Sequence, residues 1–464
     1  MRVLLATPPN RAPLRSEAPV LLRQTTQMPP LGLVRLASAL RAGGHEVRLL
    51  DLAARDGDDA DALRVVDEFR PAMVGVGSTT AQIVDACRLL GAVKSRDARI
   101  ATVLGGPHVK FFGEASARYD GVDVVLTGEA DQTVVALAEV LERGGDAATV
   151  PGVFTVRDGE VAHGPAPEVI LDLDSLGPVE RNWLGDFVYR DPAMPGRLAT
   201  TEMVRGCPYD CSFCSTPRGV IRMRSATHMA DEMESIAARG EADSVYFVDD
   251  TWNVNPRKCV EFCEELARRP NRPPWMARLR INTMKPELVA AMRAAGCVRV
   301  QLGVEAGSDE GMVSLRKRLK VEQVRAAFRL AREHGIDTMG YFMLGLPSDR
   351  TVDDVRGTVE FARSLRPTYV LFNVFTPYPH TELYDDGVRR GVVNARPWDE
   401  FVRRPTTDFS PQPWTEHLDA PTLYGEMARA YRRFYLRPAR IAAQLLRPAT
   451  WGRAAQAAYG LLRA

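Results

Sequence analysis

Residues 205–214 read RGCPYDCSFC and hold three of the seven cysteines of this 464-residue chain. Cys207, Cys211 and Cys214 have the spacing Cys-x3-Cys-x2-Cys. Three thiolates on one loop can bind three irons of a [4Fe-4S] cluster and leave the fourth iron open to an outside ligand. Two other interpretations stay open, namely a chance group of reduced thiols and a zinc ion closed by a distant residue. The compact spacing favours the cluster.

Short apolar runs alternate with helical patterns on both sides of this loop. Candidate strands end near Val204, Asp249, Ile281, Val304, Leu344 and Phe375, with helical patterns over residues 229–238, 256–268, 285–295, 321–334 and 351–364. Six strand–helix units predict a partial (β/α)6 barrel with a TIM-like arrangement, in which functional groups follow the strands at the carboxyl rim. Besides the cysteine loop, the residues expected at this rim are Asp249, Arg280, Glu305 and Asn373.

The first 145 residues show a second alternation of strands and helices. Apolar runs at residues 3–6, 47–50, 73–76, 100–104 and 122–126 alternate with helical patterns such as 31–42 and 130–142. This order predicts an α/β fold with a doubly wound, Rossmann-like parallel sheet, which binds ligands outside the carboxyl ends of its strands.

The loops at those ends contain small residues, among them Thr79, Gly105, Gly106 and Pro107. Small residues allow a flat, bulky ligand to approach the backbone. The alternative is that they are ordinary turn residues of an α/β domain. No Gly-x-Gly-x-x-Gly follows the first strand, which disfavours a nicotinamide site.

The composition excludes several classes of protein. The chain has 60 basic and 59 acidic residues, and this balance argues against nucleic acid as a partner. Its apolar runs are shorter than the roughly 18 residues of a membrane span, and the first run is too short for a signal peptide. We therefore expect a cytoplasmic protein with reduced cysteines. Four of these cysteines, Cys87, Cys259, Cys263 and Cys297, are expected to pack in the core.

Residues 200–380 resemble the radical S-adenosylmethionine (SAM) enzymes. Their signature is Cys-x3-Cys-x-aromatic-Cys, and Phe213 occupies the aromatic place. The stretches Gly303-Val304-Glu305-x-Gly307-Ser308, Gly345-Leu346-Pro347 and Thr376-Pro377-Tyr378-Pro379 also look like motifs of that family, in the expected order.

Residues 1–145 look like the cobalamin-binding domain that precedes this core in one large subclass. The stretches Gly43-Gly44-His45-Glu46-Val47 and Gly105-Gly106-Pro107-His108 carry this likeness. The chain lacks Asp-x-His-x-x-Gly, so the resemblance implies no histidine beneath the cobalt; Thr79, Thr80, Gln82 or water would face it instead.

The resemblance implies three cofactors: a [4Fe-4S] cluster on Cys207, Cys211 and Cys214, SAM, and cobalamin. Reductive cleavage of SAM would give a 5′-deoxyadenosyl radical that takes hydrogen from an unactivated carbon of a small-molecule substrate, secondary-metabolite or lipid-like. Methylcobalamin would then methylate that carbon. The cofactor-binding residues implied beside the cluster are Phe213, Asp249, Arg280, Glu305 and Asn373, and those beside cobalamin are Thr79, Gly105, Gly106 and Pro107. An electron donor such as flavodoxin or ferredoxin is an expected partner.

Two alternative functions stay open. The first keeps both cofactors but catalyses a cyclisation or rearrangement without methyl transfer. The second is a non-catalytic corrinoid or iron–sulfur carrier, which would not cleave SAM. The carboxylate of Glu305 at the predicted rim favours an enzyme over a carrier.

We expect four regions: a cobalamin-binding domain (1–145), a proline-rich connector (146–195) with a hairpin at 153–161, a radical SAM core (196–400) and a helical C-terminal region (401–464). The last 34 residues are rich in arginine and contain no acidic residue. They are expected to form a helical cap over the barrel mouth; the alternative is an amphipathic helix in peripheral contact with a membrane. The spread of arginines along the segment favours the cap.

Overall fold

The computed structural model describes residues 1–10, 28–191, 193–216 and 218–437. These residues form two compact units. The N-terminal unit comprises described residues up to 188 and, in addition, residues 395–410. The barrel unit comprises residues 189–394 and 411–437, apart from the positions outside the described ranges. Each unit has its own sheet.

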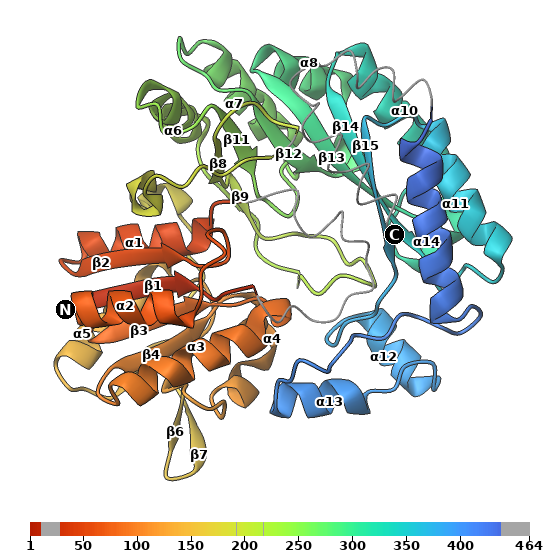
Figure 1. Cartoon of the computed structure of the whole chain (residues 1–464). Helices are drawn as coiled ribbons and strands as arrows, with labels where there is room; N and C mark the ends of the chain where they lie inside the picture. Colours follow the sequence, from red (N-terminus) through yellow and green to blue (C-terminus); the bar gives the residue numbers. More distant parts are fainter. Residues whose placement is uncertain (11–27, 192, 217, 438–464) are drawn as a thin grey trace. The chain divides into compact units, whose positions relative to one another are not determined.

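The N-terminal unit is built on a sheet with the strand order β2-β1-β3-β4-β5-β6-β7 (Figure 1). The strands are β1 (Arg2–Thr7), β2 (Glu46–Asp51), β3 (Met73–Gly77), β4 (Ala101–Gly105), β5 (Val124–Leu126), β6 (Val153–Arg157) and β7 (Glu160–His163). The helices are α1 (Leu31–Ala42), α2 (Asp59–Phe69), α3 (Ile83–Arg96), α4 (Pro107–Ser116), α5 (Ala130–Glu142) and α13 (Arg396–Arg403). Strands β1 to β5 are parallel, which confirms the predicted doubly wound sheet. Strand order reverses between β1 and β3, the place where such sheets bind ligands.

The predicted hairpin is part of this sheet and not a free connector. Strands β6 and β7 meet at Asp158 and Gly159, which both have positive φ angles. Strand β6 pairs antiparallel with β5. The pairing covers the edge of β5, whose backbone N–H and C=O groups would otherwise be unpaired.

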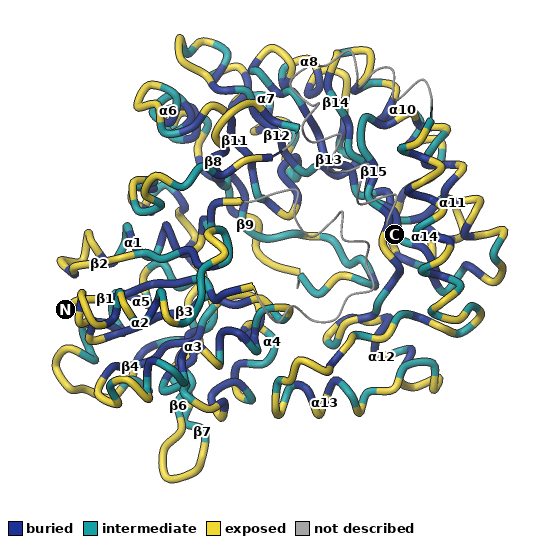
Figure 2. Tube along the Cα trace, viewed as in Figure 1, coloured by how far each residue is buried: buried dark blue, intermediate teal, exposed yellow. Residues whose placement is uncertain are grey.

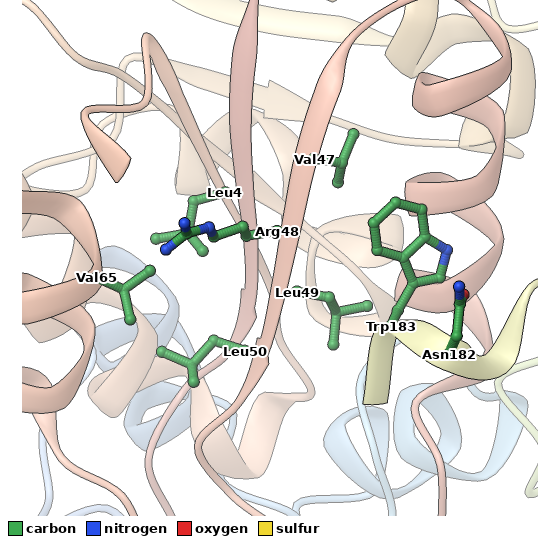
Figure 3. A pocket seen from close by; sticks show the side chains of 8 residues that line it. All are labelled: Leu4, Val47, Arg48, Leu49, Leu50, Val65, Asn182 and Trp183. Atoms are coloured by element: carbon green, nitrogen blue, oxygen red, sulfur yellow. The ribbon is translucent and has the colours of Figure 1, made fainter. Parts of the chain in front are cut away.

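The later part of the connector packs against the other edge of the sheet, at β2. A short 3-10 helix, Arg181–Leu184, places Trp183 there, with the Arg41 guanidinium 5.1 Å from the centre of its ring. A hollow of about 250 Å³ lies at this edge and is lined by Leu4, Val47, Arg48, Leu49, Leu50, Val65, Asn182 and Trp183 (Figure 3). Polar contacts hold the segment beside it, since the Glu180 N–H donates to Ser38 Oγ at 3.1 Å and Arg55 donates to the carbonyl of Leu184 at 2.9 Å.

The barrel unit contains six parallel strands in the order β15-β14-β13-β12-β11-β8. They are β8 (Leu198–Thr201), β11 (Ser244–Phe247), β12 (Trp275–Leu279), β13 (Cys297–Glu305), β14 (Asp337–Leu344) and β15 (Tyr369–Val374). The helices are α6 (Ala226–Ala238), α7 (Pro256–Ala267), α8 (Pro286–Ala294), α9 (Asp309–Ser314), α10 (Val321–Glu333), α11 (Val352–Ser364), α12 (Glu382–Arg389) and α14 (Ala420–Tyr435). This arrangement confirms the predicted partial barrel.

The core of this unit lies between the outer face of the sheet and the helices (Figure 2). Phe247, Trp252, Phe262 and Trp275 form a buried aromatic group with ring centres 5.2–6.1 Å apart. Cys259, Cys263 and Cys297 are fully buried in the same core and Cys87 is half-buried in the N-terminal unit, which confirms that these cysteines pack. Burial of this apolar surface is the main stabilising contribution.

The first barrel strand ends earlier than predicted. Strand β8 stops at Thr201, and Val204 lies instead in β9 (Val204–Arg205), which pairs antiparallel with β10 (Arg222–Met223). The carboxylate of Asp249 accepts hydrogen bonds from the backbone N–H groups of Met203 and Val204. These bonds take the place of strand pairing and direct the chain out of the barrel into the cysteine loop.

Helix α14 covers the open edge of the barrel sheet at β15. The Tyr431 hydroxyl donates to the carbonyl of Phe372 at 2.8 Å and accepts from its N–H at 3.0 Å. Tyr435, one turn later, does the same for Val370 at 2.8 and 3.1 Å. The two phenols thus satisfy backbone groups that another strand would pair.

The described part of the predicted C-terminal region therefore contributes α14 to the barrel unit, while residues 395–410 belong to the N-terminal unit. Most of the basic tail lies outside the described residues. Within the described ranges, every helix is too short or too polar to cross a membrane.

Removing the Tyr431 hydroxyl should destabilise the barrel unit. In Tyr431→Phe the N–H and C=O of Phe372 lose their partner, which costs about 1–3 kcal/mol when the groups stay buried. The midpoint of thermal unfolding should fall. Tyr369→Phe, whose hydroxyl has no hydrogen bond among the described residues, is the matched control, and equal midpoints for the two variants would contradict the role of α14 in covering this edge.

Candidate functional site

The cysteine loop leaves the barrel through β9 and is fixed at both ends. Gly206 has φ +90°, and a Cβ at this position would collide with the carbonyl oxygen of Val220. The Ser212 N–H donates to the carbonyl of Leu315 at 3.1 Å, and its own carbonyl accepts from the N–H of Leu383 at 3.0 Å. The loop is thereby tied to the ends of two other segments of the barrel unit.

The three thiols of this loop are free, and each has a polar group near its sulfur. Arg280 Nη1 donates to Cys211 Sγ at 3.5 Å, the Thr216 N–H donates to Cys214 Sγ at 3.4 Å, and Thr251 Oγ1 lies 3.7 Å from Cys207 Sγ. Burial raises the pKa of Cys214, partly offset by the hydrogen bond from the Thr216 N–H. Such donors can also bond to thiolates that hold iron. The loop therefore fits a [4Fe-4S] cluster on three cysteines.

Nowhere in the described ranges do three His, Cys, Asp or Glu side chains gather around one position as ligands of a single ion would. In a cluster each thiolate binds a different iron, so the three sulfurs need not converge on one point. The structure thus gives no support to the zinc interpretation.

Arg280 cross-links the site at the end of β12. Its guanidinium lies 3.6 Å from the centre of the Tyr209 ring and donates through Nη2 to the carbonyl of Lys317. Its backbone N–H donates to Asn253 Oδ1 at 2.8 Å. It forms no ion pair with any carboxylate in the described parts of the chain, so its positive charge is available to an anionic ligand.

Glu305 ends β13 in a strained conformation. Its φ of +72° lies in the left-handed region, which is costly for any residue but glycine, and the pairing of β13 with β14 shifts between Gly303 and Glu305. Oε1 accepts a hydrogen bond from Lys317 Nζ at 3.1 Å, and the same Nζ lies 5.6 Å from the centre of the Phe213 ring. Lys317 thus links the Glu305 carboxylate to Phe213 of the cysteine loop.

The structure therefore groups Cys211, Phe213, Arg280 and Glu305 through contacts with Lys317 and Tyr209. Lys317 was not foreseen, because it follows α9 in a loop with no motif of its own, twelve residues after Glu305. Tyr209 lies inside the cysteine motif but became recognisable only through its contact with Arg280.

Asp249 and Asn373 are placed differently from these four residues. Asp249 is 3% exposed and holds β9 through Oδ1, while no described group is bonded to its Oδ2. Burial, aided by the charge of Glu202, raises the pKa of Asp249 to about 7. Asn373 is exposed near the carboxyl end of β15. Cofactor contact by either residue stays a prediction.

In the N-terminal unit, the loops after β3 and β4 are bonded to one another. Gly106 has φ +95°, and a Cβ there would lie 2.7 Å from the backbone nitrogen of Ser78. The Ser78 N–H donates to the carbonyl of Gly105 at 2.9 Å. Thr79, Gly106 and Pro107 are exposed, so this edge presents backbone and small side chains, as a surface for a flat macrocycle requires.

His108, next to these residues, faces inward and uses both ring nitrogens. Nδ1 lies 3.1 Å from Thr80 Oγ1 and Nε2 lies 3.2 Å from the Tyr119 hydroxyl, which itself donates to the carbonyl of Val402 at 2.7 Å. Burial lowers the pKa of His108 to about 4, so the ring is neutral. Both ring nitrogens of His108 are thus engaged within the N-terminal unit.

Comparison with known proteins identifies both units. Residues 19–138 match the B12 binding domain family, and residues 201–362 match the radical SAM superfamily. The hopanoid C-3 methylase of Methylococcus capsulatus is 30% identical over 422 residues, which are 88% of this chain and 77% of that protein. The chain belongs to the cobalamin-dependent radical SAM enzymes. It is an enzyme whose cofactors are a [4Fe-4S] cluster, SAM and cobalamin, as the sequence predicted.

Other similar proteins differ in their reactions. The anaerobic magnesium-protoporphyrin IX monomethyl ester cyclase of Rubrivivax gelatinosus is 28% identical over 424 residues, 89% of this chain and 74% of that protein. The solved structure of the radical SAM methyltransferase TsrM from Kitasatospora setae, with cobalamin and a [4Fe-4S] cluster bound, superposes with a TM-score of 0.68. It is 23% identical and covers 84% of this chain and 75% of that one, so this likeness shows the fold alone.

Replacing one cysteine of the loop should remove the cluster and leave the other cofactor site intact. Cys211→Ala should lack the visible absorbance of an anaerobically reconstituted cluster, because only two thiolates remain. Cobalamin binding, measured on the same sample, should be unchanged. Cys87→Ala is the control and should keep both cofactors; loss of both cofactors in Cys211→Ala would contradict two separable sites.

Asp249 should make the barrel unit less stable as the pH rises. Its pKa is about 7 in the folded chain and near 3.8 when unfolded, so the folded state binds the extra proton between these values. The free energy of unfolding is therefore higher at low pH and falls as the pH rises towards 7. Between pH 5.5 and 8 it falls by about 2 kcal/mol.

Asp249→Asn should remove this part of the pH dependence, since an amide oxygen still accepts the two backbone hydrogen bonds. The measurement is the unfolding midpoint across pH 5.5–8. Asp250→Asn, at the exposed neighbour, should keep the wild-type slope, and an unchanged slope in Asp249→Asn would show that the carboxylate does not titrate in this range.

Proposed function

We propose that this enzyme methylates a carbon of a small-molecule substrate. The observation that carries the proposal is the group around Arg280 and Glu305, in a chain that also has a B12 binding domain. Arg280 contacts Cys211 and has no carboxylate partner among the described residues, and Glu305 is linked to Phe213 of the cysteine loop through Lys317. The hopanoid C-3 methylase among the similar proteins supports the same reaction. When bound, the cluster with SAM supplies a 5′-deoxyadenosyl radical, and cobalamin supplies the methyl group.

In this proposal the residues beside the cluster bind and orient SAM. Arg280 binds its carboxylate by charge-assisted hydrogen bonds, because the guanidinium has no carboxylate partner among the described residues. Glu305 accepts hydrogen bonds from its amino group or ribose, held at the correct angle by Lys317. Phe213 excludes water next to Cys214. Asp249 positions the cysteine loop through β9, and Asn373 contributes from the end of β15.

Cobalamin is proposed to rest on the exposed loops after β3 and β4. Thr79, Gly105, Gly106 and Pro107 would contact the corrin ring, and Gly106 is suited to this because its backbone is exposed and carries no side chain. With His108 turned inward, Thr79, Thr80, Gln82 or water would face the cobalt. Electrons for the cluster would come from a donor such as flavodoxin or ferredoxin, in the cytoplasm.

A second function, radical cyclisation or rearrangement without methyl transfer, is favoured by the similarity to the magnesium-protoporphyrin cyclase. The two functions differ in what happens to the methyl group of SAM. A methyltransferase must use SAM in two ways, once as the source of the radical and once as the source of the methyl group.

Anaerobic protein reconstituted with iron, sulfide and cobalamin should therefore give two products from SAM labelled in its methyl group. Under reducing conditions we expect both 5′-deoxyadenosine and S-adenosylhomocysteine. For each S-adenosylhomocysteine formed, the labelled methyl group should be found on the protein-bound cobalamin. 5′-Deoxyadenosine alone would favour the rearrangement, and absence of 5′-deoxyadenosine would overturn the enzyme mechanism. Protein prepared without cobalamin is the control and should give no S-adenosylhomocysteine.

A further inference from the structure

The inner face of the barrel sheet carries a layer of polar side chains below the rim. Side chains alternate along each strand, so Val300, Phe342 and Phe372 pack in the core under the helices while their neighbours point to the opposite, inner face. These neighbours include Gln301 on β13, Tyr341 on β14 and Leu371 on β15. By the pairing of the strands, Arg278 of β12 lies beside Gln301.

These polar side chains form one hydrogen-bonded network. The hydroxyls of Tyr246 and Tyr341 both donate to Gln301 Oε1 at 2.9 Å. Arg278 Nη2 donates to the Tyr246 hydroxyl at 3.0 Å. Tyr246 and Gln301 are buried, whereas Arg278 and Tyr341 are partly exposed. The buried pair fixes the network in place, and the two partly exposed side chains can be reached by a ligand.

Arg278 has no acidic partner within ion-pair distance in the part of the chain that the structure describes. The exposed carboxylate of Asp250 acts on it only from longer range. Two other cations of this unit are paired: Arg299 on β13 pairs with Asp191 at 3.4 Å, and Lys317 in the loop after α9 pairs with Glu305 at 3.1 Å. One hydrogen bond to a phenol leaves most of the five N–H donors of the guanidinium unused.

A partly buried cation without a partner is costly, and it is retained where an anion binds to it. Arg280 lies two residues further along β12, about 7 Å nearer the rim, and is the residue that contacts Cys211. Arg278 thus lies deeper than the proposed SAM carboxylate site, on the side of the barrel where a substrate would be held.

We infer that Arg278 binds a carboxylate group of the substrate, with Tyr341 as a second hydrogen-bond donor or acceptor. One guanidinium neutralises one charge, so a monoanion fits the layer better than a dianionic phosphate. Among the other inner-face side chains of β14 and β15, Met339, Met343 and Leu371 are apolar and partly exposed, while polar side chains stand at the two ends of the strands, namely Asp337, Tyr369 and Asn373. The substrate class is therefore a small carboxylic acid with an apolar body. This inference rests on the proposed function, because it presupposes that the barrel binds the substrate of the proposed reaction.

Binding of hexanoate and of hexanamide to the reconstituted full-length chain tests the inference, since the two probes share their shape and differ in charge. Dissociation constants from ligand-observed NMR require no turnover. Wild-type protein should bind hexanoate about tenfold more tightly than hexanamide, the gain typical of one charge-assisted hydrogen-bonded contact. Arg278→Gln should abolish the preference and Arg278→Lys should restore part of it. Arg329→Gln, at an exposed position on α10, should behave as the wild type.

Equal binding of the two probes by the wild type, no binding of either, or a preference that survives in Arg278→Gln would overturn the inference. SAM binding by Arg278→Gln is measured on the same protein. A loss of SAM binding in this variant would assign Arg278 to the cofactor and would likewise overturn it. Because probe binding and SAM cleavage are measured separately, failure of the carboxylate site is distinguishable from failure of the proposed methyl transfer.

Discussion

The guanidinium of Arg280 is the interaction on which the site depends. Removing a positive charge from water is costly unless other groups replace the lost hydration. Here the replacements are three groups from two separate segments: the Tyr209 ring and the Cys211 sulfur of the cysteine loop, and the Lys317 carbonyl after α9. Since Lys317 in turn holds Glu305, one side chain at the end of β12 fixes the loop, the carboxylate and their spacing together.

Much of the fold could be predicted from the sequence because it depends on local pattern. The apolar period distinguishes strands from helices, and α1 and α5 occur over the expected residues 31–42 and 130–142. The pairing of β6 with β5 could not be predicted in the same way, because the sequence of a hairpin does not indicate which edge strand of a sheet it pairs with. The return of residues 395–410 to the N-terminal unit, where Val402 accepts a hydrogen bond from Tyr119, is likewise a long-range choice.

The site residues that belong to a sequence motif could be predicted. The three cysteines, the aromatic residue between them and the carboxylate after β13 have fixed spacings that require no knowledge of the fold. Lys317 and Arg278 have no such signal, because their importance comes from which charges surround them. Asp249 shows the opposite case: its position after β11 suggested contact with a cofactor, whereas its observed hydrogen bonds are to the backbone of β9.

Because α14 covers the edge of the barrel sheet, it affects which substitutions β15 can accept. Tyr431 and Tyr435 bind the main chain of β15 and not its side chains. Protection of that edge is therefore independent of the amino acids that β15 presents on its inner face, such as Leu371 and Asn373. A substitution at Leu371 would thus change the inner face without exposing a strand that would pair with other molecules.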